Sequence, residues 1–130
     1  MLNKDQKKLI VDGISLSALF AGVSFLLMPS LAMRFFGMNR EASEQAGSKL
    51  AGRVIGIRDF AFGLMLWLTR DDPKAQKPWI KAFGYCLCAD SLAALLVLRK
   101  PHAGFFTFAG GVVLSFVLGT LAWLTHKDEE

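Results

Sequence analysis

The residues best suited to chemistry are four charged side chains that lie within two long apolar stretches of the chain. Arg53, Arg58 and Asp59 belong to the stretch 50–68, and Asp90 lies near the middle of a later one. Two carboxyl groups beside an arginine can act as acid and base, because an apolar setting can keep one protonated while the other stays ionised. The arginine can stabilise negative charge that develops on a substrate oxygen. These four are therefore the predicted catalytic residues.

A helix over 50–68 would place one of these carboxylates against a neighbouring helix. At the helical repeat, Gly52, Gly56, Asp59 and Gly63 fall on one narrow stripe. Two glycines four residues apart let another helix approach closely, so this stripe is the expected contact face. The two arginines flank the stripe on either side. The sequence does not decide which of them pairs with the carboxylates.

The elements that must position these residues are four apolar runs, each long enough to cross a bilayer as a helix. Hydrophobic residues make up 53% of the chain and charged residues 20%, and the charges cluster in short blocks between the runs. The runs are residues 9–28, 50–68, 79–98 and 103–125. They predict an all-α, four-helix transmembrane bundle formed by one domain over residues 1–130. The protein is expected to be a multi-pass integral membrane protein.

The distribution of basic residues predicts the orientation of this bundle. The side that holds both termini and the middle loop carries more Lys and Arg than the opposite side. The positive-inside rule then places both termini in the cytoplasm. Because the basic residues lie in loops, the net charge of +4 does not indicate binding to nucleic acid.

Two further polar residues are candidate accessory groups, and no cofactor or metal is expected. Asp12 lies near the start of the first run and could give protons access to the central site, although an acid there also suits a helix start. Tyr85 lies at about the depth of Asp90. Cys86 and Cys88 are two residues apart on a predicted helix, so they point in different directions and form neither a disulfide nor a metal site.

The second run also carries a recognisable motif. Residues 53–64 follow the pattern R-x-x-G-x-R-D-x-x-x-G-L. This pattern resembles small four-span integral membrane proteins of unknown function from fungi and bacteria, which are loosely similar to DoxX-like proteins. The resemblance implies the four-span fold for nearly the whole chain and marks Arg53, Arg58 and Asp59. It implies no reaction.

Three hypotheses about function remain open from the sequence. The first is a cofactor-independent enzyme that opens an epoxide, isomerises or cyclises a small lipophilic substrate. Its Asp–Arg–Asp set would be similar to that of limonene-type epoxide hydrolases, without a shared fold. The second is a structural or interaction protein in which a buried ion pair fixes helix register. The third is a small dimeric transporter, coupled to protons or carrying an anion.

The expected partners are the lipid bilayer and a lipophilic small molecule. The last run carries small residues at four-residue spacing: Thr107, Gly111, Ser115 and Gly119. Such a ladder suits contact with the other helices or with a second subunit, so a homodimer stays open as an alternative.

Overall fold

The computed structural model describes residues 3–97, 104–105 and 107–127, and every regular element in these ranges is helical. The prediction of an all-α fold is therefore confirmed. In chain order the elements are α1 (Lys4–Leu27), α2 (Pro29–Phe35), α3 (Arg40–Ser43), α4 (Ala46–Leu68), α5 (Pro73–Val97), η1 (Thr107–Leu114) and α6 (Ser115–Lys127).

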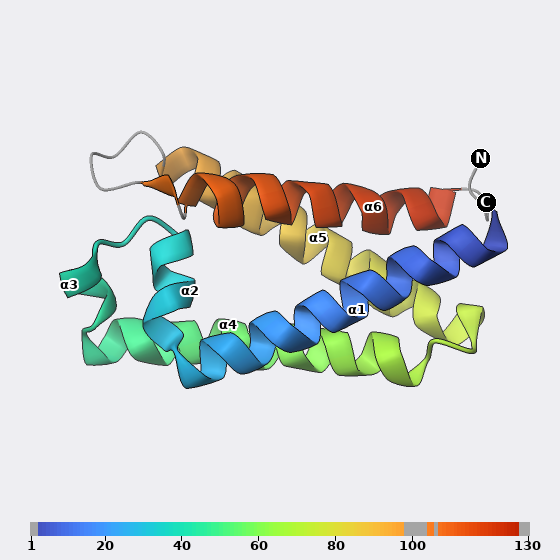
Figure 1. Ribbon diagram of the computed structural model, residues 1–130, viewed down its shortest axis with the longest axis horizontal. Coiled ribbons are helices and arrows are strands. Elements are labelled where there is room, and N and C mark those ends of the chain that lie inside the picture. Colours follow the sequence, from blue (N-terminus) through green and yellow to red (C-terminus); the bar gives the residue numbers. More distant parts are fainter. Residues whose placement is uncertain (1–2, 98–103, 106, 128–130) are drawn as a thin grey trace.

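The long helices form two antiparallel pairs that lie one over the other (Figure 1). One pair is α1 with α4, and the other is α5 with η1 and α6. Both ends of the chain lie at one end of the bundle, and α2 stands at the opposite end between the two pairs (Figure 1). Any group that joins α4 to α5 therefore ties the two pairs together.

Local capping sequences make the first and third long helices start earlier than the apolar runs do. Asn3 caps α1 through a capping box with Gln6. Asp72 Oδ1 accepts hydrogen bonds from the N–H groups of Lys74 and Ala75, at 3.0 and 3.2 Å. Proline is favoured at the first position of a helix, so α5 begins at Pro73 and includes residues expected in a loop. Residue 98, the predicted end of the third run, and residue 103, the predicted start of the fourth, lie outside the described residues.

The ladder of small residues in the last run makes contacts within the chain. A Cβ at Gly111 would lie 2.7 Å from Ala94 Cβ and 2.5 Å from the carbonyl oxygen of Phe35. A Cβ at Gly119 would lie 2.9 Å from Cys88 Sγ of α5. Residues 107–114 are π-helical, and the hydroxyl of Thr107 donates to the carbonyl oxygen of Arg34 at 3.1 Å. The ladder thus joins η1 and α6 to α2 and α5.

Large apolar side chains cover the outer faces of the bundle as well as its core. The buried core cluster lies in the half that holds the termini and consists of Val11, Ile14, Ala18, Leu66, Ile80, Phe83, Leu87 and Ala122. Leu9, Phe20 and Phe105 are examples of the outer apolar side chains, each about three-quarters exposed. A soluble domain rarely exposes so much contiguous apolar surface, and such surfaces mark contacts with membranes or partners.

Among the described residues, three helical segments are long and apolar enough to cross a membrane: Lys4–Leu27, Pro73–Leu96 and Thr107–Thr125. They correspond to the first, third and fourth predicted runs. The helix α4 has a similar length but carries Arg53, Arg58 and Asp59 in its apolar stretch. The length and composition of these helices suggest a membrane protein.

Candidate active site

A stripe of small residues on α4 brings Asp59 into the interior. The buried residues of α4 are Gly52, Gly56, Asp59, Gly63 and Leu66, which repeat at intervals of four and three. A Cβ at Gly56 would lie 2.9 Å from the carbonyl oxygen of Gly22, and one at Gly63 would lie 2.7 Å from the backbone nitrogen of Leu19. The backbones of α1 and α4 are therefore in direct contact, and the carboxylate of Asp59 is held on this contact face.

Arg58 bonds to two carboxylates at once. Its Nε and Nη2 donate to Oδ1 of Asp59 at 2.9 and 2.8 Å. Its Nη1 and Nη2 donate to Oδ1 and Oδ2 of Asp90 at 3.0 and 2.6 Å. The pair with Asp90 is bidentate and crosses from α4 to α5, whereas the pair with Asp59 stays within α4. We call Arg58, Asp59 and Asp90 the triad.

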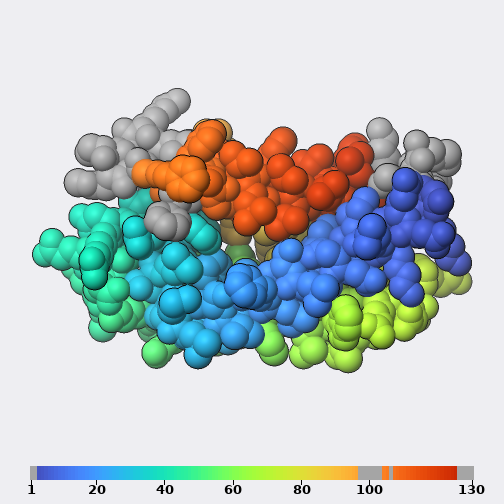
Figure 2. Space-filling model, in the orientation of Figure 1, coloured from blue at the N-terminus to red at the C-terminus, as the bar shows by residue number. Residues whose placement is uncertain are grey.

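The side chains of the triad are largely buried, but each keeps some exposed surface. The side chains of Arg58, Asp59 and Asp90 are 28%, 8% and 17% exposed. On the face shown in Figure 2 the surface is hollowed between α1 and α6, and atoms of α4 and α5 are visible at the bottom of the hollow. Because the side chain of Arg58 is more exposed than that of Asp59, a small molecule reaches the guanidinium more easily than the carboxylate.

The triad has one carboxylate more than its guanidinium can balance. In the described part of the chain, Arg58 is the cation that forms ion pairs with both carboxylates. The four recorded bonds occupy four of its five N–H groups. Both oxygens of Asp90 accept bonds, but Oδ2 of Asp59 has no recorded partner among the described residues. That oxygen is an available position for a proton.

The other predicted site residues lie away from the triad. Arg53 is exposed and lines a cavity at the α2 end of the bundle. Tyr85 is 70% exposed, so its hydroxyl is not part of the buried site. Asp12 lines a second cavity at the end that holds the termini. Leu19 of α1 lies against Gly63 of α4. Asp12 precedes Leu19 by seven residues, which is about 10 Å along the helix and away from the triad.

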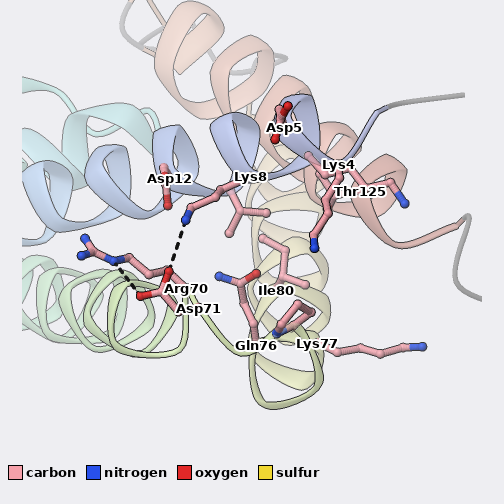
Figure 3. Close-up of a pocket in the computed structure, with 13 residues that line it drawn as sticks. Lys4, Asp5, Lys8, Asp12, Arg70, Asp71, Gln76, Lys77, Ile80 and Thr125 are labelled. Atoms are coloured by element: carbon pink, nitrogen blue, oxygen red, sulfur yellow. Dashed lines mark hydrogen bonds and ion pairs between the residues drawn. The ribbon is translucent and has the colours of Figure 1, made fainter.

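The cavity that contains Asp12 has a volume of about 630 Å³ and mixes charges of both signs. Figure 3 shows Asp12 beside Lys8, while the side chain of Lys77 extends away from the cavity. Lys8 Nζ donates to Oδ1 of Asp71 at 3.2 Å, and Arg70 Nε lies 3.5 Å from its Oδ2. The hydrogen bond from Lys8 lowers the pKa of Asp71 from its ordinary value of 3.8. This cavity is thus a network of surface ion pairs.

The cavity at the α2 end has a volume of about 500 Å³ and is mainly basic. We call it the basic cavity. Its charged lining residues are Arg34, Arg40, Glu44, Lys49 and Arg53. In the sequence these residues are spread over twenty positions. Most of them are expected to be charges of a loop region, so the sequence does not predict that they line one cavity. The signal that could reveal them is the short amphipathic segment after Pro29, which folds back to bring Arg34 near the start of α4.

The described residues contain no group of three or more His, Cys, Asp or Glu side chains that could hold a metal ion. The triad supplies two carboxylates, and the bonds from Arg58 already occupy three of their four oxygens. The chemistry that this arrangement offers is proton transfer and stabilisation of negative charge.

Comparison with known proteins gives one family. Residues 15–124 match the family described as a domain of unknown function, DUF4267. No curated protein and no solved structure matches the chain.

Proposed function

The chain belongs to the DUF4267 family of unknown function, and we propose that it is a four-span membrane enzyme whose triad performs acid–base chemistry on a small lipophilic substrate. The candidate reactions are epoxide opening, isomerisation and cyclisation, since each needs only a proton donor, a proton acceptor and charge stabilisation.

The proposed topology adds α4 to the three apolar helices. Its 23 residues extend about 34 Å, which matches a hydrocarbon core of about 30 Å. It runs antiparallel to α1 along a backbone contact, so the two would cross the bilayer together (Figure 1). Four crossings put both termini on one side, and the bias of Lys and Arg makes that side the cytoplasm.

Single engineered cysteines test this topology. Glu41 and Ala75 are both exposed: Glu41 lies in α3, between α2 and α4, and Ala75 lies in the first turn of α5, just after the segment that follows α4. Cys86 and Cys88 are first replaced by alanine. A membrane-impermeant maleimide should label the two positions from opposite sides of the membrane. Labelling of both from the same side would contradict a membrane-spanning α4.

The observation that carries the enzymatic proposal is the surplus carboxylate. A purely structural ion pair needs one carboxylate for one guanidinium, but Arg58 serves both Asp59 and Asp90. Burying an unbalanced charge is expensive, and two carboxylates that share one site tend to hold a proton between them. Each carboxylate accepts two bonds from the guanidinium, but Asp90 accepts them on both of its oxygens and Asp59 on Oδ1 alone. Asp90 is therefore the better candidate for the ionised partner. Oδ2 of Asp59 is the better candidate to carry the proton.

With an epoxide, the proposed step balances as follows. Asp59 gives its proton to the epoxide oxygen as the carbon–oxygen bond breaks. A water molecule attacks the carbon and loses a proton to Asp90, so that the product is a diol. A proton then passes from Asp90 back to Asp59 to restore the starting state. Arg58 keeps both carboxylates in place throughout and has one N–H group left for a developing oxyanion.

The surroundings favour a lipophilic substrate over a transported anion. The faces around the bundle are apolar, so a lipophilic molecule dissolved in the bilayer can reach the partly exposed guanidinium. An anion would meet a guanidinium whose positive charge is already balanced by a carboxylate and which is already bonded to both acids. Electrostatics therefore disfavour an anion at this site.

The test combines turnover with direct detection of the proton. Purified protein in lipid nanodiscs is incubated with a panel of lipophilic epoxides and enones. Asp59→Asn and Asp90→Asn should each reduce turnover by roughly 10²–10⁴-fold, the usual contribution of a positioned acid or base. Asp71→Asn, the same change in an exposed residue, should leave turnover unchanged.

Infrared spectroscopy supplies the readout that needs no substrate. The wild-type protein at neutral pH should show the carbonyl stretch of a protonated carboxylic acid, which Asp59→Asn removes. An enzyme whose turnover survives Asp59→Asn would contradict the assigned role. Absence of both turnover and a protonated carboxyl would leave the triad as a structural ion pair.

A further inference from the structure

We infer that the basic cavity at the α2 end binds a phosphate group, supplied by the headgroup of an anionic phospholipid. The inference does not depend on the reaction proposed for the triad. It concerns Arg53, which the sequence singled out and which the triad does not use.

Cationic side chains from three helices converge on this cavity. Arg34 comes from α2, Arg40 from α3, and Lys49 and Arg53 from α4. Among the described lining residues the one carboxylate is Glu44, so the lining carries a net charge of +3. Three of the four cations are arginines, whose planar forks match the oxygens of a phosphate.

The single carboxylate is already engaged by one of these cations. Glu44 Oε2 lies 2.7 Å from Lys49 Nζ. The hydrogen bond from Lys49, aided by Ser30, lowers the pKa of Glu44 from its ordinary value of 4.5. Glu44 therefore stays ionised and offsets one of the four positive charges, so the lining keeps a net positive charge.

The rim of the cavity suits the rest of a lipid. Leu27, Met28 and Leu31 line it beside the charged residues, and Leu27 and Met28 are 76% and 55% exposed. Leu27 ends α1 and the other two residues follow it, at the point where a membrane-spanning helix would reach the headgroup level. Arginines beside apolar surface at this level suit the phosphate of an anionic headgroup, which in the proposed topology belongs to the leaflet opposite the cytoplasm. A volume of about 500 Å³ admits a phosphate with its glycerol.

The inference is tested by native mass spectrometry of the full-length protein in detergent with phosphatidylglycerol or phosphatidylcholine added. Phosphatidylglycerol should bind and phosphatidylcholine should bind much more weakly. Removing a cation near a lipid surface costs about fivefold in affinity. Arg40→Ala and Arg53→Ala should each weaken phosphatidylglycerol binding about fivefold, and the double variant roughly 25-fold. Both side chains are exposed, so neither change opens a cavity in the core.

Matched controls separate a defined site from general charge attraction. Lys77→Ala removes one positive charge at the opposite end of the bundle and should leave phosphatidylglycerol binding unchanged. Arg53→Lys should retain most of the binding. Equal weakening by Lys77→Ala, or equal binding of the two lipids, would overturn the inference. Asp59→Asn should still bind phosphatidylglycerol, so failure of the lipid site and failure of the triad are distinguishable.

A second experiment, which measures melting temperature, distinguishes a lipid headgroup from soluble inorganic phosphate as the ligand. If inorganic phosphate raises the melting temperature as much as phosphatidylglycerol does, and Arg53→Ala removes both effects, the cavity binds soluble phosphate and the lipid source is refuted. If phosphate alone has no effect while phosphatidylglycerol stabilises the wild type, the lipid is the ligand.

Discussion

The contact between α1 and α4 should make Gly56 intolerant of even one added carbon. A Cβ at Gly56 would lie 2.9 Å from the carbonyl oxygen of Gly22 and 2.9 Å from the backbone nitrogen of Leu26. Both obstacles are backbone atoms of α1, so no side chain can rotate to make room. Carbon contacts are most favourable at about 3.5–4.0 Å, so Gly56→Ala must separate the helices by about 0.6 Å.

The cost of this separation can be compared with a matched glycine. Overpacking of this kind costs about 1–3 kcal/mol, and a shift of roughly 0.5 Å already forfeits about a quarter of the attraction at each contact. Alanine gains about 1 kcal/mol over glycine inside a helix, which partly hides the loss. Gly13 lies inside α1 with nothing within 4 Å of its Cβ position. Gly13→Ala therefore receives the same gain without the clash.

The assay is unfolding of the purified protein by sodium dodecyl sulfate in mild detergent. The free energy of unfolding of Gly56→Ala should lie about 1–3 kcal/mol below that of Gly13→Ala, because the propensity gain cancels in the comparison. Equal free energies for the two variants would mean that α1 and α4 are not in backbone contact. The placement of Asp59 on a buried face would then fail as well.

Three further predictions follow from other contacts. Asp59→Asn and Asp90→Asn should each cost little stability alone, because the other carboxylate still balances the guanidinium; the double variant should lose roughly 3–5 kcal/mol in the same assay, and additive losses would contradict the shared bond. Asp71→Asn should lower the melting temperature in low salt by an amount that is constant above pH 3.8 and shrinks below it, because the stability from a lowered carboxyl pKa is lost as the native group protonates; a difference that persists in acid would contradict the ion pair. Ser15→Ala removes a buried 2.8 Å hydrogen bond to the carbonyl oxygen of Gly63 and should cost about 0.6 kcal/mol in detergent unfolding; a larger loss would mean that the hydroxyl does more than bridge the helices.

Helical periodicity identifies the buried face of α4 from the sequence alone. The glycine stripe works as a signal because only glycine tolerates backbone contact, so the spacing of Gly52, Gly56 and Gly63 marks the face turned to α1. The choice between Arg53 and Arg58 could not be made in this way. Both flank the stripe, and what decides between them is that α5 covers one flank while α2 closes the other end.

Depth along a helix and position around it are different quantities, and Tyr85 illustrates the difference. Tyr85 precedes Asp90 by five residues, which is about 140° around the helix axis, so the two side chains point to different faces. The start of α5 cannot be predicted from Pro73, because proline is common in turns and is equally suited to the first position of a helix. The cap formed by Asp72 decides between these two roles.

The bond between Arg58 and its own neighbour Asp59 has a consequence for how the chain is made. In the proposed four-span topology, α4 reaches the membrane during synthesis before Asp90 exists as a partner for Arg58. An isolated charge at the centre of an inserting helix costs about 2.5–3.5 kcal/mol. The Nε and Nη2 groups of Arg58 bond to Asp59 within α4 itself. If this pair forms as soon as the helix does, Arg58 enters the membrane together with its counter-charge. Asp59 would thus lower the cost of inserting Arg58 into the membrane. The bond from Arg58 to Asp90 would form later, when α5 packs against α4.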